Sequence, residues 1–364
     1  MPEDERVSIS SEASTGSAWG RLRDWRVWLG IAITVLCLVI AMRGVPLGEV
    51  WEAVKRADLL VLLGLSLPCY VANVFVRALR WRHLTNPIAS IDRAPLFRAA
   101  AIGFMVNNLV PLRVGEIVRT LTLARETGTS PAAILATVVL ERILDTITVL
   151  LIGASTLAWL GASSSEAGLL AEGAKLLLLA AVAPVGGLVA LRVTPEPTIA
   201  FAVWCCRPLP ARAGNWLEHN LRSFAEGLGA LSGGWHLFWL AFHSMTIWLV
   251  ISTIPLLAGV LAFGLDLGTL PETVTICWLL LAAVGASVAL PSAPGFFGPY
   301  QLAFKVVLVR FGVDPATALA LGLLVWFVFW AALTLQGLIV VRLGHMPLAE
   351  LTHDPSKDPA TDRR

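Results

Sequence analysis

The stretch GFMVNNLVPLRVGEIVRTLTLARETGTSPAAILATVVLERILD, residues 103–145, decides the fold class because it places charged residues inside a strongly apolar sequence. Its polar and helix-breaking members are Asn107, Asn108, Pro111, Arg113, Glu116, Arg119, Glu141, Arg142 and Asp145. An ionisable group at the centre of a bilayer costs about 3 kcal/mol on insertion scales, so such groups pair and often mark a transport path or a reaction site. This cluster is therefore the candidate functional site.

The composition around this stretch is that of a membrane protein. Of the 364 residues, 57% are hydrophobic and 14% are charged, and the mean hydropathy is +0.76. A bilayer core about 30 Å thick needs about 20 apolar residues per helix. The sequence predicts an all-α polytopic membrane protein with about six full transmembrane helices, at 27–42, 59–76, 132–160, 169–191, 236–263 and 317–341.

Charge and cysteine content exclude several other classes of protein. The formal net charge is +2, and the arginines interrupt apolar segments instead of forming a basic face, which excludes a nucleic-acid partner. The five cysteines have neither a disulfide pattern nor metal-ligand spacing, so no metal and no cofactor are expected. No phosphate-binding glycine-rich loop is present, so ATP is not expected as a direct energy source.

The arginine distribution orients the predicted spans. Arginines follow the second and fourth spans, so the loops there are predicted to be cytoplasmic. Residues 1–26 are predicted to be a disordered cytoplasmic tail, 27–342 a single membrane domain and 343–364 a second cytoplasmic tail. Within the domain, apolar residues at near-helical spacing in the cytoplasmic loop 194–235 predict an amphipathic interfacial helix or a short packed connector.

An internal repeat relates two parts of the membrane domain. GTSPAAILA at 128–136 and GVDPATALA at 312–320 share Gly, Pro, Ala, Leu and Ala, and each follows an apolar segment broken by Pro and Gly, 99–116 or 273–301. The repeat-like halves lie near 99–160 and 273–341. Broken segments are either kinked helices or re-entrant hairpins. Because three full spans separate them, the re-entrant interpretation gives two re-entrant broken-helix hairpins of opposite orientation, an inverted repeat of the kind found in transporters.

The first broken segment has the residues that an anionic headgroup requires. Pro111 and Gly115 are expected to break the helix, and the Asn107 and Asn108 side chains can bond the backbone groups that are freed. Arg113 beside the break can bind a phosphate oxygen bidentately, helped by free N–H groups at a helix start.

The third predicted span carries the second half of the cluster. Glu141 and Asp145 lie four residues apart on one helical face, and Arg142 reaches Asp145 at i+3. Two acids and one arginine leave a surplus negative charge, which Arg113 or Arg119 is expected to balance. Two roles stay open for this group, a buried ion-pair network that braces the broken segment and direct contact with a lipid.

Other polar residues supplement the cluster. Arg77 follows Asn73 by one turn and is expected to be a second cation for the headgroup, whereas Arg80 and Arg82 are expected to be interfacial anchors. In the second broken segment, LPSAPGFFGPYQ at 290–301, the polar residues Ser292, Tyr300 and Gln301 are expected to line a cavity. The two phenylalanines there either contact acyl or isoprenoid chains or simply pack.

Four motifs together resemble the lysylphosphatidylglycerol synthase transmembrane, or flippase-like, family. They are RALRWRHL at 77–84, NNLVPLRVGEIVRTLTL at 107–123, ERILD at 141–145 and LPSAPGFFGPYQ at 290–301. The resemblance implies a multi-pass protein of the cell inner membrane, with both termini cytoplasmic, that moves lipid between leaflets. The best understood members carry a soluble aminoacyl-transferase domain after the membrane part, and since this chain ends at Arg364, the synthase reaction alone is not expected.

The predicted function is translocation of an anionic phospholipid, an aminoacylated lipid or a lipid-linked phosphate or glycan. The residues predicted to bind the substrate are Arg77, Asn107, Asn108, Arg113, Glu116, Arg119, Glu141, Arg142, Asp145 and Gln301. The alternatives are a membrane-embedded transferase or hydrolase for a polyprenyl-phosphate lipid and a non-catalytic scaffold of a lipid-modifying complex. Expected partners are the membrane, a lipid with a phosphate headgroup, a lipid-synthesising enzyme and a second copy of the chain.

Overall fold

The structure, a computed structural model, describes residues 25–111, 113–162, 167–206, 234–288 and 293–344, with isolated positions between 214 and 225. These residues are helical throughout apart from the connecting turns. The predicted tails, except for their innermost residues, most of the loop 207–233 and Ser292 lie outside the described residues. Of the cytoplasmic loop, helix α9, Pro195–Cys205, is described.

Within the described residues, five helical stretches are long and apolar enough to cross a membrane, which confirms the polytopic all-α class. They lie at Leu59–Thr85, Glu172–Val193, Phe238–Ala262, Leu270–Val288 and Pro315–Leu343. Helices α2, Trp25–Met42, and α3, Leu47–Arg56, are bent by 81° and add a sixth span if the pair counts as one. The predicted span 236–263 is interrupted and consists of α11, Gly234–Met245, the π-helix η1, Thr246–Ile251, and α12, Ile254–Ala262.

The first broken segment is a hairpin of α5, Arg93–Leu109, and α6, Gly115–Thr127, which pack on each other. The break falls where it was predicted. Val110 has extended backbone before Pro111, and the Asn107 Oδ1 atom accepts a hydrogen bond from the freed Gly115 N–H at 2.8 Å. A Cβ at Gly115 would lie 2.0 Å from the Gly103 carbonyl oxygen, so the hairpin closes only with glycine at this crossing.

The second broken segment is longer than predicted. Helix α13, Leu270–Val288, is itself long enough to span, and the 3₁₀ turn η2, Pro294–Phe296, and α14, Pro299–Arg310, come after it. Helices α13 and α14 pack on each other, as α5 and α6 do. The break lies at the end of a full-length helix because the prolines and glycines gather at 291–298, beyond nineteen residues of uninterrupted helix.

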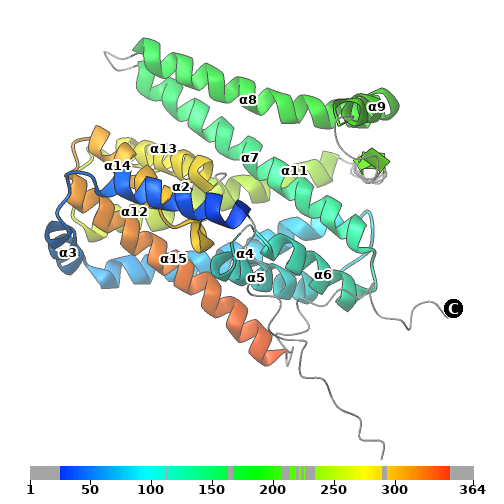
Figure 1. The fold of residues 1–364 in the computed structure, drawn as a ribbon, viewed down its shortest axis with the longest axis horizontal. Coiled ribbons are helices and arrows are strands. Elements are labelled where there is room, and N and C mark those ends of the chain that lie inside the picture. Colours follow the sequence, from blue (N-terminus) through cyan, green and yellow to red (C-terminus); the bar gives the residue numbers. More distant parts are fainter. Residues whose placement is uncertain are drawn as a thin grey trace, which may run out of the picture.

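The two hairpins exchange partners with the long helices that follow them. Helix α5 packs on α15, Pro315–Leu343, while α13 packs on α7, Pro131–Ala162 (Figure 1). The loops before α7 and α15 also match, because Gly128 and Gly312 have φ of 68° and 80° and a proline begins each long helix. Helix α4, Leu59–Thr85, packs on α5, α7, α12 and α15 and so joins the two halves.

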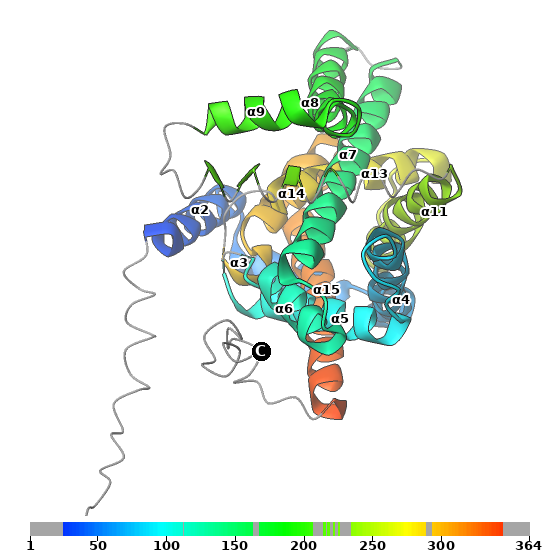
Figure 2. The ribbon, with the colours of Figure 1, turned by 90° about the vertical axis from the view of Figure 1, so that its right-hand side faces the viewer.

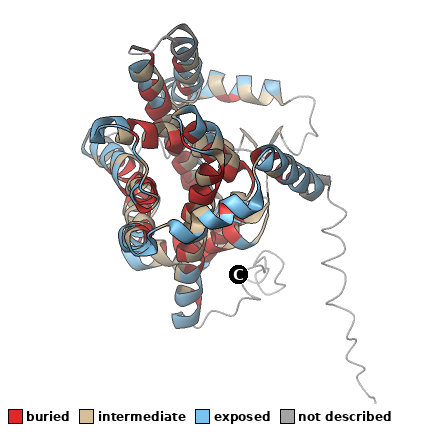
Figure 3. Cartoon of the chain, turned by 90° about the vertical axis from the view of Figure 1, so that its left-hand side faces the viewer, coloured by how far each residue is buried: buried red, intermediate tan, exposed pale blue. Residues whose placement is uncertain are grey.

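Two further helices, α2 and α8 (Ala167–Val193), lie at the outside of the bundle. Helix α2 packs on α14, and α8 packs on α7 away from the rest of the bundle (Figures 1 and 2). Figure 3 shows buried residues gathered in the middle of the bundle and exposed ones around it. The exposed apolar side chains of α2 and α8, among them Val39 and Leu179, are those expected of helices that face lipid.

Candidate functional site

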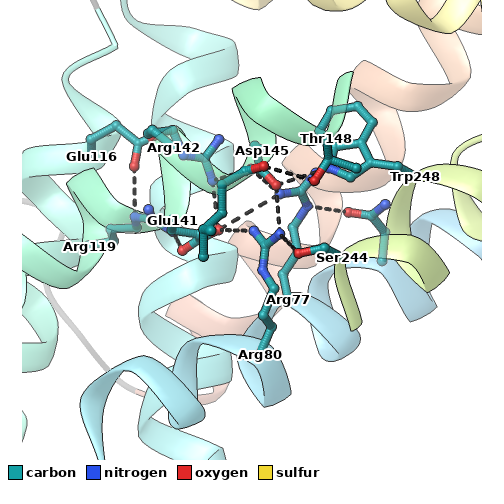
Figure 4. Close-up of polar contacts among 12 residues, drawn as sticks. Arg77, Arg80, Glu116, Arg119, Glu141, Arg142, Asp145, Thr148, Ser244 and Trp248 are labelled. Atoms are coloured by element: carbon teal, nitrogen blue, oxygen red, sulfur yellow. Dashed lines mark hydrogen bonds and ion pairs between the residues drawn. The ribbon is translucent and has the colours of Figure 1, made fainter. Parts of the chain in front are cut away.

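A network of charged side chains lies where α4, α6 and α7 meet (Figure 4). Its members are Arg77 and Arg80 from α4, Glu116 and Arg119 from α6, and Glu141, Arg142 and Asp145 from α7. The structure thus brings together six of the ten residues predicted to bind substrate, and Arg80 in addition.

Glu141 and Arg80 form the centre of the network, and both are 0% exposed. The Glu141 carboxylate accepts hydrogen bonds from Arg80 Nη2 at 3.1 Å, Arg119 Nη1 at 3.0 Å and Arg142 Nη2 at 2.7 Å. Arg80 also donates to Asp145 Oδ1 at 2.7 Å and to Ser244 Oγ at 3.0 Å. Buried charges persist only when they are paired and hydrogen-bonded, so each of these groups depends on the others.

Asp145 is fixed from three sides. Arg77 Nη1 and Arg80 Nη1 donate to its two oxygens at 2.9 and 2.7 Å, and Trp248 Nε1 donates to Oδ1 at 3.0 Å. Trp248 lies in the π-helix η1, a wide turn of the kind often found at functional sites. The guanidinium of Arg77 lies 5.3 Å from the Trp248 ring and donates through Nε to Asn73 Oδ1 at 2.8 Å.

Arg119 connects the buried centre to the first hairpin. Its Nε atom lies 2.7 Å from Glu116 Oε2, and its guanidinium lies 4.9 Å from the ring of Trp81, whose own Nε1 donates to Thr137 Oγ1 at 2.8 Å. Arg119 is 2% exposed, so the α6 side of the network is also closed.

The network is open at one end. The side chains of Arg142 and Glu116 are 31% and 18% exposed, whereas those of Arg80 and Glu141 are 0% exposed. Arg113, at the first break with φ of 55°, interacts electrostatically with both Arg142 and Glu116. We call Arg113, Glu116 and Arg142 the rim.

Arginines outnumber carboxylates in the network. Four arginines and three carboxylates make direct ion pairs, for a formal charge of +1, and Arg113 raises it to +2. The negative surplus predicted for α7 alone is balanced by Arg119, as expected, which lies 3.0 Å from Glu141, and by Arg77 and Arg80 from α4, which pair with Asp145. Arg80 was expected at the membrane interface and is instead fully buried. Its position three residues after Arg77, on the same helical face, is the signal that identifies it.

The other predicted residues brace the breaks. Asn108 donates through Nδ2 to the Trp330 carbonyl oxygen at 3.1 Å and to Thr334 Oγ1 at 3.2 Å, which fixes the end of α5 on α15. The structure places Gln301 apart from the network, 1% exposed, with its Oε1 accepting from Gly298 N–H at 2.7 Å. Gln301 therefore caps the start of α14.

Exposed apolar side chains lie close to the rim in sequence, and the described residues contain no group of side chains placed to hold a metal. Leu109, Ile117 and Val139, close to the rim in sequence on α5, α6 and α7, are 47%, 56% and 47% exposed, as side chains that face lipid are. Among the described residues no three His, Cys, Asp or Glu side chains are grouped to hold a metal, and the five cysteines are free. The arrangement can hold an anion beside hydrocarbon.

Two curated relatives share sequence with this chain. Glycosyltransferase AglD of Haloferax volcanii is 24% identical over 81% of this chain and 50% of the relative. A UPF0104 membrane protein of Methanothermobacter thermautotrophicus is 31% identical over 32% of this chain and 35% of the relative. The chain thus spans half or less of the length of these relatives, and no solved structure matches it.

The charged network and the two broken segments all lie within the residues matched by one protein family. The family described as lysylphosphatidylglycerol synthase TM region matches residues 27–337, which include every residue of the network and both hairpins. The chain belongs to the lysylphosphatidylglycerol synthase transmembrane-region family.

Proposed function

We propose that this chain moves a lipid with a phosphate-bearing headgroup between the leaflets of the membrane, without direct use of ATP. One observation carries the proposal, the surplus of guanidinium charge at a partly exposed rim whose sequence neighbours on α5, α6 and α7 include exposed apolar side chains. A soluble anion does not need an apolar border, whereas a headgroup whose tails stay in the bilayer does.

In this proposal Arg142 and Arg113 bind the phosphate. Arginine matches phosphate oxygens with two parallel N–H donors, and such charge-assisted bonds are the stronger ones. The Nε–H of Arg142 is buried without a hydrogen-bond acceptor, since its ion-pair partner Glu116 Oε1 lies 3.8 Å away, so one donor of the rim remains for a ligand. Glu116, the carboxylate of the rim, reduces the positive charge of the rim. It is also the group that a cationic part of a headgroup would meet.

The buried centre braces the rim and does not itself meet the lipid. Glu141 is held by three arginines and Asp145 by two arginines and a tryptophan, so each carboxylate has few free lone pairs. Arg77, Arg119, Glu141 and Asp145 then contribute by holding α4, α6 and α7 in register. Asn107 and Asn108 contribute in the same way by fixing the first break.

The two hairpins are, in this proposal, re-entrant halves of an inverted repeat. Their exchanged packing on α7 and α15 and the matched Gly and Pro positions in the preceding loops support a duplication. Inverted repeats with discontinuous helices place their substrate between the halves, near the midplane. The arginine distribution supports an orientation with both termini in the cytoplasm, and the family supports the cell inner membrane as the location.

A membrane-embedded transferase or hydrolase for a polyprenyl-phosphate lipid is the second candidate. The name of the relative from Haloferax volcanii favours it, but that relative is twice as long as the part this chain matches. A general acid or base needs a carboxylate that can exchange a proton, and Glu141 and Asp145 are locked by arginines. We therefore favour translocation, with any synthesis left to a partner enzyme.

A liposome assay tests the function directly. Purified protein is reconstituted with fluorescent phosphatidylglycerol in both leaflets, and a membrane-impermeant reductant then bleaches the outer leaflet. We expect bleaching beyond the outer-leaflet fraction with protein and none in empty liposomes. Bleaching that stops at the outer-leaflet fraction with protein present contradicts the proposal. A parallel incubation with labelled polyprenyl-phosphate donor and Mg²⁺ addresses the enzyme, because a chemically altered lipid there favours the second candidate.

A further inference from the structure

Partly exposed aromatic rings gather at the second break. They are Phe296 and Phe297 beside η2 and Trp326 and Trp330 on α15, which we call the aromatic cluster. The ring centroids of Phe297 and Trp326 are 4.8 Å apart, and those of Trp326 and Trp330 are 6.2 Å apart. The rings are thus contiguous.

Both indole N–H groups of the cluster are used within the protein. Trp326 Nε1 donates to the Gly295 carbonyl oxygen at 2.6 Å, and Trp330 Nε1 donates to the Asn108 carbonyl oxygen at 3.1 Å. A tryptophan whose N–H is satisfied presents only apolar ring surface to a ligand. The cluster therefore has no free indole N–H donor for a headgroup, and it presents apolar ring surface on which a hydrocarbon chain can pack.

The aromatic cluster lies next to the rim. The guanidinium of Arg113 lies 5.6 Å from the Phe296 ring centroid, and its Nη2 donates to the Val288 carbonyl oxygen at the end of α13. Arg113 and Phe296 are the two non-glycine residues with positive φ among the described residues, at 55° and 62°. The tips of the two breaks meet through these two side chains, so a ligand at the rim lies next to the cluster.

The internal repeat relates the cluster to the rim position by position. Pairing Gly128 with Gly312 also pairs the first residues of α6 and α14 and the first residues of α7 and α15. The same register sets Arg113 against Phe297, Glu116 against Tyr300 and Arg142 against Trp326. At equivalent places one half is charged and the other aromatic, as the two ends of an amphiphile require.

We propose that the aromatic cluster is the subsite for the hydrocarbon chain of the lipid whose phosphate is bound at the rim. The inference rests on the proposed function for the identity of the headgroup. The chain segment nearest the phosphate packs on Trp326 and Phe297, while the remainder stays in the bilayer. Van der Waals packing of this segment on the rings then holds the lipid with its phosphate against Arg113 and Arg142.

Photolabelling of the full chain in nanodiscs tests the subsite. Phosphatidylglycerol with a diazirine near the carbonyl of its acyl chain is irradiated, and labelled peptides are located by mass spectrometry. We expect label on η2 and on α15 near Trp326. The variant Trp326→Ala should lower that label about fivefold, Trp326→Phe should keep most of it because the ring remains, and the exposed aromatic control Phe242→Ala on α11 should leave it unchanged.

A second arm uses polyprenyl phosphate with a diazirine in the first isoprene unit, and label in either arm that depends on Trp326 supports the subsite. Label spread over exposed helices and unaffected by Trp326→Ala overturns it. The liposome assay keeps the two proposals separate. Label at the cluster without transport contradicts the proposed function alone, and transport without label at the cluster overturns the subsite alone.

Discussion

The two broken segments of this protein have similar backbones and opposite chemistry. The first, between α5 and α6, is bordered by Arg113, Glu116 and Arg142 and opens at a partly exposed rim. The second, between α13 and α14, is bordered by aromatic rings. Trp326 donates to the Gly295 carbonyl oxygen in the second break, and Trp330 donates to the Asn108 carbonyl oxygen at the first break. Helix α2 also covers the second break, through a hydrogen bond from Ala293 N–H to Thr34 Oγ1 at 2.8 Å.

Under the proposed duplication, this difference suits the two halves to the two ends of the proposed amphiphilic ligand. Where α7 carries the buried Glu141, the matched position of α15 is Val325, 1% exposed. An apolar core needs no partners, whereas a buried carboxylate needs several, and so arginines from α4, α6 and α7 converge on the first half alone. The first half is polar and closed by ion pairs, and the second is apolar and closed by packing.

The largest effect is expected from closing the space at the first hairpin. In Gly115→Ala the new Cβ would lie 2.0 Å from a backbone oxygen, so α5 and α6 must separate, at a cost of about 4 kcal/mol in unfolding free energy. Thermal unfolding in detergent measures it. Gly64→Ala is the control because nothing lies within 4 Å of its added Cβ. Equal stability of the two variants would show that the hairpin does not depend on this close crossing.

The next largest effect is expected at the centre of the network. Glu141→Ala leaves three arginines without their shared acceptor and should lower the unfolding free energy by about 3 kcal/mol. The same unfolding measurement applies. Glu172→Ala removes the exposed ion pair with Lys175 and should change stability by less than about 0.5 kcal/mol. If Glu141→Ala unfolds like the parent and still loses transport, Glu141 contacts the lipid and the brace assignment is wrong.

Arg142→Ala should separate binding from stability. The fully buried Glu141 keeps Arg80 and Arg119 as partners when Arg142 is removed, so the unfolding free energy should fall by less than for Glu141→Ala, by about 1 to 2 kcal/mol. Loss of one charge-assisted bond to phosphate should slow transport of phosphatidylglycerol about tenfold in the liposome assay. Lys175→Ala, a cation far from the rim in sequence and paired on the protein surface, should transport normally. Normal transport by Arg142→Ala would remove the rim from the mechanism.

The smallest effect is expected at the cover of the second break. Thr34→Val keeps the shape of the side chain and removes one hydrogen bond, so stability should fall by about 1 kcal/mol. The control is Thr198→Val. The Thr198 hydroxyl donates an exposed hydrogen bond to the Thr194 carbonyl oxygen, four residues earlier in the chain. A loss for Thr34→Val no larger than for the control would mean that α2 does not hold the second break.

Local chemistry made much of this fold predictable. Pro111 and Gly115 predict the first break because proline lacks an N–H and glycine has no side chain. As expected, the Asn107 side chain accepts a hydrogen bond from a backbone N–H at the break. The charged face of α7 follows from the spacing of Glu141 and Asp145 alone.

The parts that the sequence did not reveal depend on distant contacts. The pairing of Arg77 and Arg80 with Asp145 was not predicted because both arginines lie more than sixty residues from Asp145 along the chain. Arg80 resembled an interfacial anchor because Trp and Arg at the end of a span have that role in most membrane proteins. The π-helix η1 places Trp248 against Asp145. Residues 246–251 contain no sequence pattern that distinguishes this π-helix from an ordinary α-helix.

Lipid retention tests the central claim, that the rim binds a phosphate headgroup, most directly. The parent, Arg113→Ala, Arg142→Ala and Lys175→Ala are purified in mild detergent, and native mass spectrometry then identifies the lipids that remain bound. The account predicts one class of phosphate-bearing anionic lipid on the parent and on Lys175→Ala, and its loss from both rim variants. Equal retention of that lipid by all four proteins would contradict it.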